Sequence, residues 1–159
     1  MTDQERFSSL MQEAAILLDQ LILLLQEERS SLSQNNAALT QTILTRKTEL
    51  LALLEQNSQQ RNQLLVSQGL SADDSGVQAY FKSLPQNVAK SYAEKWQVLE
   101  EKLENCKAEN LINGKIIHRS RQQVDVLLNL LQGNSGASKI YTENGQAKSV
   151  NRHHPLAEV

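Results

Sequence analysis

Apolar residues recur through much of the chain at alternating steps of three and four, the spacing of an α-helix that buries one face. The first series consists of Phe7, Leu10, Ala14, Leu17, Leu21 and Leu24. Residues 2–68 contain neither glycine nor proline, a composition typical of helix. Because Thr2 and Glu5 have the spacing of a capping box, the pattern predicts a first helix that begins just after Thr2.

The polar sequence SQNN at residues 33–36 interrupts this series with residue types that cap helices or turn chains. Gly69 stands where a C-terminal cap glycine belongs, so we predict a second helix between these two points. Its apolar face consists of Leu39, Ile43, Leu50, Leu54 and Leu65. The alternative is one long bent helix, because apolar residues also recur every seven positions across the proposed break, at Met11, Leu18, Leu25, Leu32 and Leu39.

Two further helices are expected on the same grounds. Ser71 and Asp74 can cap a short third helix, which Pro85 ends and whose apolar face is Val77, Tyr80, Phe81 and Leu84. The last helix is predicted from about residue 86 to residue 132, with the seam Trp96, Leu99, Leu103, Cys106, Asn110, Asn113, Ile117, Ser120, Val124, Leu127 and Leu131. It would be roughly 70 Å long, against roughly 45 to 50 Å for the first two. A helix of this length either bends back or projects beyond its partners.

Three residues interrupt the middle of this last seam. Asn110 and Asn113 occupy seam positions, and a buried asparagine can fix the register between helices. Gly114 follows them, and an interior glycine costs about 1 kcal/mol unless a neighbouring backbone needs the room. We interpret all three as packing and register residues rather than as ligand contacts.

Together these patterns predict an all-α protein, an elongated antiparallel bundle of about four helices with the third short and the last longest. Residues 1–133 would form the bundle domain. Residues 134–159 would form a flexible C-terminal tail, because their glycine- and serine-rich composition cannot bury enough apolar surface to fold alone. Ile140 and Tyr141 are an isolated apolar pair within that tail.

Composition and charge narrow the function. The net charge of -2 arises from 16 basic and 18 acidic residues, which argues against nucleic acid as a partner. The chain has one cysteine and no secretion-signal pattern, so a reducing cytoplasm is expected. The most apolar stretch is interrupted by Asp19 and Gln20, which favours a buried helix over membrane insertion.

Candidate chemistry is sparse. His118, His153 and His154 lack the partners of a metal site, so no metal or other cofactor is predicted. Cys106 falls on the apolar seam, where a thiol is usually a small buried hydrophobe. Glu100, Glu101 and Glu104 are interpreted as a solvated helical face. We expect no catalytic residues and no enzyme.

The order of several segments resembles the FlgN family of flagellar export chaperones. These segments are LLLQEERSSL, RKTELLALLEQ, RNQLLVSQGL, WQVLEEKLENCKAENLINGKII, LLNLLQG and YTENGQ. The resemblance implies a cytoplasmic chaperone that binds hook-filament junction proteins by their helical terminal segment. It would prevent premature assembly and deliver them to the flagellar type III export gate, a membrane protein. The resemblance also implies that cargo binds from the last helix into the tail, and that Tyr141 is the gate-docking tyrosine.

Specific site residues follow from these considerations. If the last helix projects, Val124, Leu127, Leu128 and Leu131 would offer an apolar groove to the C-terminal helical segment of the cargo. The alternative is that they complete the core. Ile140 and Tyr141 would dock on the gate, or else pack on the bundle. The alternative function is a self-assembling structural coiled coil, and a homodimer is compatible with either function.

Overall fold

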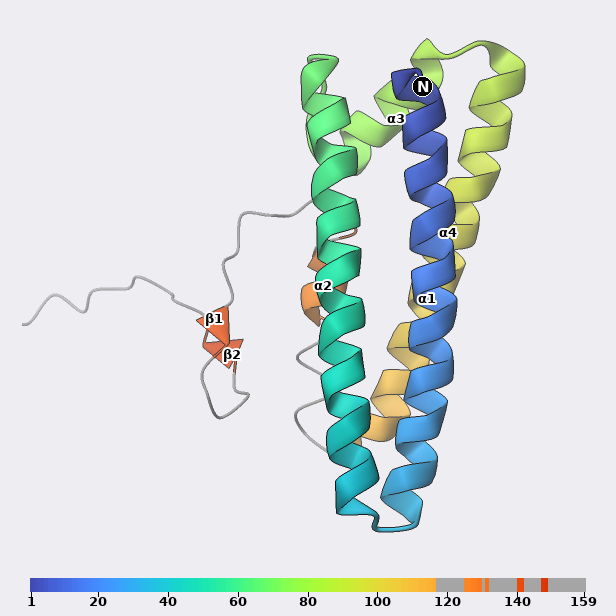
Figure 1. Ribbon diagram of the computed structural model, residues 1–159. Helices are drawn as coiled ribbons and strands as arrows, with labels where there is room; N and C mark the ends of the chain where they lie inside the picture. Colours follow the sequence, from blue (N-terminus) through green and yellow to red (C-terminus); the bar gives the residue numbers. More distant parts are fainter. Residues whose placement is uncertain (117–124, 130, 132–139, 142–146, 149–159) are drawn as a thin grey trace, which may run out of the picture.

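The computed structural model describes residues 1–116, 125–129 and 131, together with the backbone of 140–141 and 147–148. The elements in chain order are α1 (Asp3–Ser33), α2 (Ala37–Ser67), α3 (Asp74–Ser83), α4 (Gln86–Gly114), β1 (Ile140–Tyr141) and β2 (Ala147–Lys148). The three long helices lie side by side, and the short α3 lies at one end of them (Figure 1). The predicted all-α bundle is confirmed.

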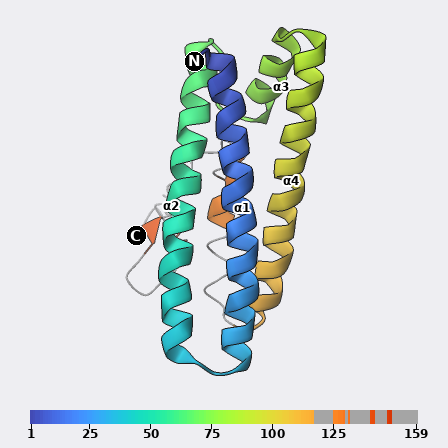
Figure 2. The same ribbon diagram turned by 45° about the vertical axis from the view of Figure 1, so that its right-hand side comes forward.

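The directions of the helices differ within the bundle. Helix α2 runs antiparallel to α1, as the contacts of Asn57 with Leu10 and of Lys47 with Glu28 show. Helix α4 instead runs parallel to α1, because its residues meet α1 at a constant separation of 88 residues at Tyr92, Cys106 and Asn113. The short α3 carries the chain across the end of the bundle, so that α4 can start at the same end as α1 and run in the same direction (Figures 1 and 2).

Local capping signals fix the start of α1. The Thr2 hydroxyl accepts the Glu5 backbone N–H at 3.1 Å, and the Glu5 carboxylate accepts the Thr2 backbone N–H at 2.7 Å. This is the predicted capping box, which satisfies donors that the first helical turn leaves free.

The break between α1 and α2 falls where the SQNN sequence predicts it. Asn35 adopts a positive φ of 52°, a conformation that asparagine tolerates better than most residues. Asn36 then caps α2 by accepting the Leu39 backbone N–H at 3.1 Å. The single bent helix is therefore wrong. Leu39 is exposed, so it does not belong to the apolar face predicted for the second helix.

A glycine ends α2 as expected. Gly69 has a φ of 73°, its N–H donates to Val66, and the Leu70 N–H donates to Leu65, each at 2.9 Å. These two bonds form a Schellman motif, in which the residue after the glycine folds back on the helix. Leu70 accordingly packs against the core.

The cap of α3 is Asp73, not the predicted Ser71 or Asp74. The Asp73 carboxylate accepts the Gly76 backbone N–H at 2.8 Å and the Ser71 hydroxyl at 2.7 Å. A Cβ at Gly76 would lie 1.7 Å from the Ser71 carbonyl oxygen, so this tight approach needs glycine. The predicted apolar face is confirmed, since Val77, Tyr80 and Phe81 are buried.

The prediction of a last helix over residues 86–132 is wrong, and so is its rank as the longest helix. Helix α4 has 29 residues and ends at Gly114, whereas α1 and α2 have 31 residues each. Residues 125–129 are again helical, and Leu127 belongs to the same core as Leu99 and Leu103. The chain has therefore turned back along the bundle, which buries apolar side chains that a straight helix would leave without a partner.

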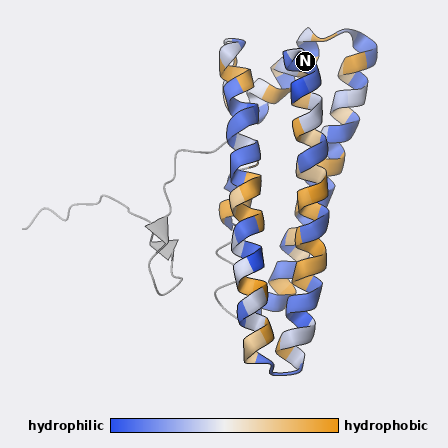
Figure 3. Ribbon diagram, viewed as in Figure 1, coloured by the Kyte–Doolittle hydropathy of each residue, from blue (hydrophilic) through white to orange (hydrophobic). Residues whose placement is uncertain are grey.

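The core is a continuous apolar seam with an aromatic cluster at the α3 end. Phe7 of α1 lies 5.0 Å from Tyr80 and 6.1 Å from Phe81 between ring centroids, and Phe81 lies 6.2 Å from Trp96. Figure 3 shows hydrophobic stretches along α1, which packs against both α2 and α4. By length and composition α1 could cross a membrane, but the side that carries its buried leucines is occupied by the other helices.

The described part of the predicted tail contains two short strands. β1 pairs with β2 antiparallel, with Ile140 opposite Lys148 and Tyr141 opposite Ala147. The rest of residues 134–159, and the flexibility predicted for them, lie outside the described residues.

Candidate functional site

The leucines predicted to bind cargo do not form an exposed groove. Leu127 is fully buried and Leu131 is 8% exposed, while Leu128 is partly buried against the same core. Val124 lies outside the described residues. Because the chain turns back after α4, these positions contribute to the bundle instead of projecting from it.

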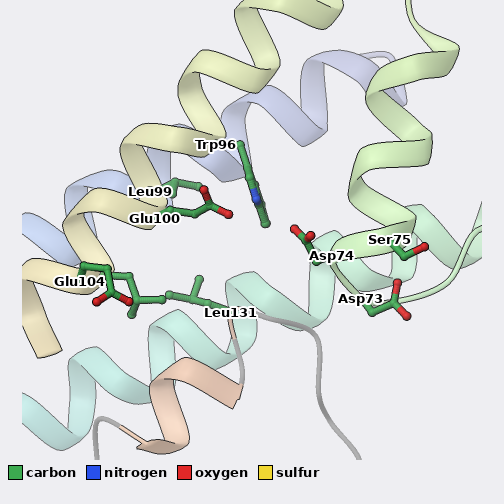
Figure 4. A pocket seen from close by; sticks show the side chains of 9 residues that line it. Asp73, Asp74, Ser75, Trp96, Leu99, Glu100, Glu104 and Leu131 are labelled. Carbon is green, nitrogen blue, oxygen red and sulfur yellow. The ribbon is translucent and has the colours of Figure 1, made fainter.

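Leu131 nevertheless borders a concave surface. A pocket of about 650 Å³ opens between the start of α3 and one side of α4. Its apolar lining residues are Trp96, Leu99, Leu103 and Leu131. Its polar lining residues are Asp73, Asp74, Ser75, Glu100 and Glu104 (Figure 4). We call this feature the acidic pocket.

Helical spacing places the α4 residues of the acidic pocket. Trp96, Leu99 and Leu103 follow the three-four seam and form its apolar wall. Glu100 and Glu104 are four residues apart and lie on the adjacent ridge of the same helix. An apolar surface and a row of carboxylates thus face the same space.

The carboxylates of the acidic pocket form no salt bridge with the part of the chain that the structure describes. Hydrogen bonds from Ser71 and Gly76 lower the pKa of Asp73, which keeps that carboxylate ionised. Among the described residues, Asp74, Glu100 and Glu104 take part in none of the salt bridges or side-chain hydrogen bonds. The pocket therefore presents negative charge around an apolar interior.

Trp96 of the acidic pocket has a buried donor without a partner among the described residues. It is 7% exposed, and its indole Nε1 has no hydrogen-bond partner. Figure 4 shows its ring reaching toward Asp74. The guanidinium carbon of Arg61 lies 5.2 Å from the centroid of the Trp96 ring, and Arg61 Nε donates to Asn57 at 3.0 Å. Burial lowers the pKa of Arg61 to about 10, which still leaves it protonated at neutral pH.

A second polar group lies at the opposite end of the bundle. Lys47 Nζ lies 2.9 Å from the Glu28 carboxylate, and both side chains are almost fully buried. Asn113 Nδ2 donates to the Leu25 carbonyl at 2.7 Å and to Glu28 at 3.0 Å. Burial lowers the pKa of Lys47, while Glu28 acts in the opposite direction. We call Glu28, Lys47 and Asn113 the buried polar cluster.

The predicted packing residues fall in and beside the buried polar cluster. Asn110 and Asn113 are 1% and 0% exposed, respectively. The bonds of Asn113 to α1 are of the kind that a register-setting residue would make. Gly114 is the last residue of α4, so it is not the interior glycine that the sequence predicted. Sequence reasoning missed Glu28 and Lys47, because nothing in local spacing reveals that two charged residues 19 apart will pair inside the core.

Sequence reasoning also missed the acidic pocket as a site. It identified Trp96, Leu99 and Leu103 as seam residues and interpreted Glu100 and Glu104 as a solvated face. The available signal was that both sets lie on one helix, which follows the short helix that the sequence Asp-Asp-Ser at residues 73–75 begins. The side chains of Ile140 and Tyr141 lie outside what the structure describes, although their backbone forms β1.

Redox or metal chemistry receives little support from the described region. Cys106 is buried, its thiol contacts the Leu18 carbonyl oxygen at 3.7 Å, and burial raises its pKa to about 12. Within the described ranges, no three His, Cys, Asp or Glu residues are grouped closely enough to hold a metal ion. His118, His153 and His154 lie outside those ranges.

Comparison with known proteins identifies the family to which this chain belongs. The family model described as FlgN protein matches residues 1–149. A crystal structure of a flagella synthesis protein FlgN from Pseudomonas aeruginosa is 29% identical, with a TM-score of 0.69 over 82% of this chain and 99% of that chain. A search of curated proteins found no match. The helical bundle and the family match over nearly the whole chain agree, and the protein belongs to the FlgN family of flagellar synthesis proteins.

Proposed function

We propose that this protein is a cytoplasmic export chaperone of the bacterial flagellum. It binds the C-terminal helical segment of hook-filament junction proteins, prevents their premature assembly and delivers them to the flagellar type III export gate. The observation that carries this proposal is the FlgN family match over residues 1–149. The described bundle supports it, because it offers an apolar pocket with a charged rim, a feature suited to holding part of another chain.

A direct binding experiment tests this function. Purified full-length protein is titrated by calorimetry with C-terminal segments of hook-filament junction proteins, and segments from unrelated helical proteins serve as controls. We expect binding at micromolar or lower concentration for at least one junction protein. Absence of binding to all of them would reject the chaperone function.

The bundle and tail have separate roles in this proposal. Residues 1–133 hold cargo, and residues 134–159 carry the gate-docking pair Ile140 and Tyr141. Tyrosine suits such a role, because it buries a large ring with few rotatable bonds and keeps a hydroxyl for a polar partner.

Tyr141→Ala separates the two roles. We expect it to weaken binding to the cytoplasmic part of the export gate by about 2 kcal/mol or more, the loss typical of a buried aromatic anchor. Cargo affinity and helical content should stay near wild type. Binding to both partners is measured by calorimetry, with Tyr92→Phe as a tyrosine control within the bundle. Equal losses for both partners would place Tyr141 in the cargo site or the fold.

The second candidate function is a self-assembling helical adaptor. It is favoured by Ile16 and Leu23, which lie seven residues apart on α1 and are 52% and 60% exposed. Such a pair could serve as part of a homodimer seam. Light scattering decides between the candidates, because a large stable oligomer without cargo supports assembly, whereas a monomer or dimer that gains cargo supports the chaperone.

A further inference from the structure

The acidic pocket has the shape and chemistry of a receptor for a protein segment. Its volume of about 650 Å³ is well above what one leucine side chain needs. Its inner surface comprises Trp96, Leu99, Leu103 and Leu131, which are 3% to 8% exposed, so an apolar side chain of a partner would gain mainly by packing against them in the pocket. The position of the pocket between two helices, α3 and α4, is common for binding sites.

The charge of the rim selects the kind of segment. Asp73, Asp74, Glu100 and Glu104 surround the opening, and the last three form no salt bridge with any described residue. Such a rim favours lysine or arginine in a partner and repels a free terminal carboxylate.

We propose that the acidic pocket binds a basic amphipathic turn of the cargo helix. One apolar cargo side chain enters between Trp96, Leu99 and Leu103, and neighbouring lysine or arginine side chains pair with Asp74, Glu100 and Glu104. This inference rests on the proposed chaperone function and specifies where and by what chemistry the cargo binds. It also moves the cargo site from Leu127, which is fully buried, to the surface that Leu131 borders.

A charge-reversal pair tests the pocket without disturbing the core. Glu100 and Glu104 are exposed and unpaired among the described residues, so Glu100→Lys together with Glu104→Lys should fold normally. The matched control is Glu94→Lys together with Glu101→Lys, which changes two exposed glutamates of α4 that do not line the pocket. Both variants change the net charge equally. Circular dichroism and thermal unfolding check that both remain folded.

We expect the pocket variant to lose at least tenfold in affinity for the junction-protein segment at low salt, and the control to change by less than about threefold. The difference should shrink as salt is raised. A cargo segment whose lysines and arginines are replaced by glutamate should bind wild type poorly and regain affinity for the pocket variant.

The outcomes separate the two proposals. Wild-type binding to cargo with an unimpaired pocket variant, or equal losses in both variants, would overturn the pocket assignment alone. Failure of wild type to bind any junction protein would overturn the chaperone function and the pocket assignment together. A changed oligomeric state in the pocket variant with unchanged cargo affinity would show that a second copy of the chain occupies the pocket.

Discussion

Near the turn between α1 and α2, the Glu28 carboxylate lies 2.9 Å from Lys47 Nζ inside the bundle. Near α3, by contrast, Asp74, Glu100 and Glu104 border a pocket, and none of them has an ion-pair partner within the described part of the chain. Charges removed from water need partners, because their desolvation is costly. Charges left at an opening remain available to another molecule. The comparison thus separates charge that holds the fold from charge that can recognise a partner.

The largest effect should come from breaking the buried pair. Lys47→Ala removes the buried cation that lies 2.9 Å from the Glu28 carboxylate, and we expect a loss of about 3–5 kcal/mol in the free energy of unfolding, measured by urea denaturation. Arg46→Ala is the matched control, because Arg46 makes an exposed pair with Glu27 at 3.5 Å. It should cost less than about 1 kcal/mol. Similar losses in both variants would contradict a special role for burial.

A smaller effect is expected at Asn113 in the same cluster. Asn113→Ala removes the donor to Leu25 and Glu28, and we expect about 2 kcal/mol of destabilisation because buried acceptors lose a partner. The exposed Asn105→Ala on the same helix should change stability by less than about 0.5 kcal/mol. If Asn113→Ala changed neither the free energy of unfolding nor the hydrogen exchange of α4, Asn113 would not set the register between α1 and α4.

Cys106 offers a pH test of a buried thiol in the core. Burial raises the pKa of the Cys106 thiol from its ordinary value of 9.0 to about 12, so the folded protein retains the thiol proton while the unfolded chain releases it. Stability is therefore fully present below the unfolded pKa and falls as pH rises between these two values. From about pH 8 to about pH 10 the loss should be about 1.4 kcal/mol. Urea denaturation of Cys106→Ala should lack this component, and an unchanged pH slope would contradict it.

The smallest effect on stability should occur at the acidic pocket. Glu100→Gln together with Glu104→Gln removes two charges that have no partner among the described residues. We expect the free energy of unfolding to stay within about 0.5 kcal/mol of wild type in urea denaturation. A loss above about 1 kcal/mol would reveal a structural role for Glu100 and Glu104. The acidic pocket would then differ less from the buried polar cluster in its contribution to stability.

Local signals predicted the helix boundaries that local chemistry determines. Thr2 with Glu5 and Gly69 mark helix ends through bonds within a few residues, so their spacing is sufficient. The end of α4 was missed for a physical reason. Leu127 and Leu131 keep the three-four spacing after the chain has turned back, because they pack into the same core as Leu99 and Leu103. Periodicity records burial and does not distinguish one helix from two that share a core.

The candidate site depended on tertiary geometry to a greater extent. In the sequence, Glu100 and Glu104 are indistinguishable from a solvated helical face. They line a pocket only because α3 packs beside α4 and Leu131 contributes to the same lining. The pairing of Glu28 with Lys47 likewise requires the antiparallel register of α1 and α2. Neither arrangement leaves a mark in residue spacing.

The parallel packing of α1 and α4 has a consequence for the order of folding. Gln4, Leu18 and Leu25 each contact a residue 88 positions later, whereas only residues 34–36 connect α1 to α2. Contacts distant in sequence require a large loop to close and therefore form late. On the ribosome, we expect the α1–α2 hairpin to assemble while the face of α1 that packs against α4 is still exposed. Residues 92–113 then dock last, and the leucines of α1 remain open to aggregation until they do.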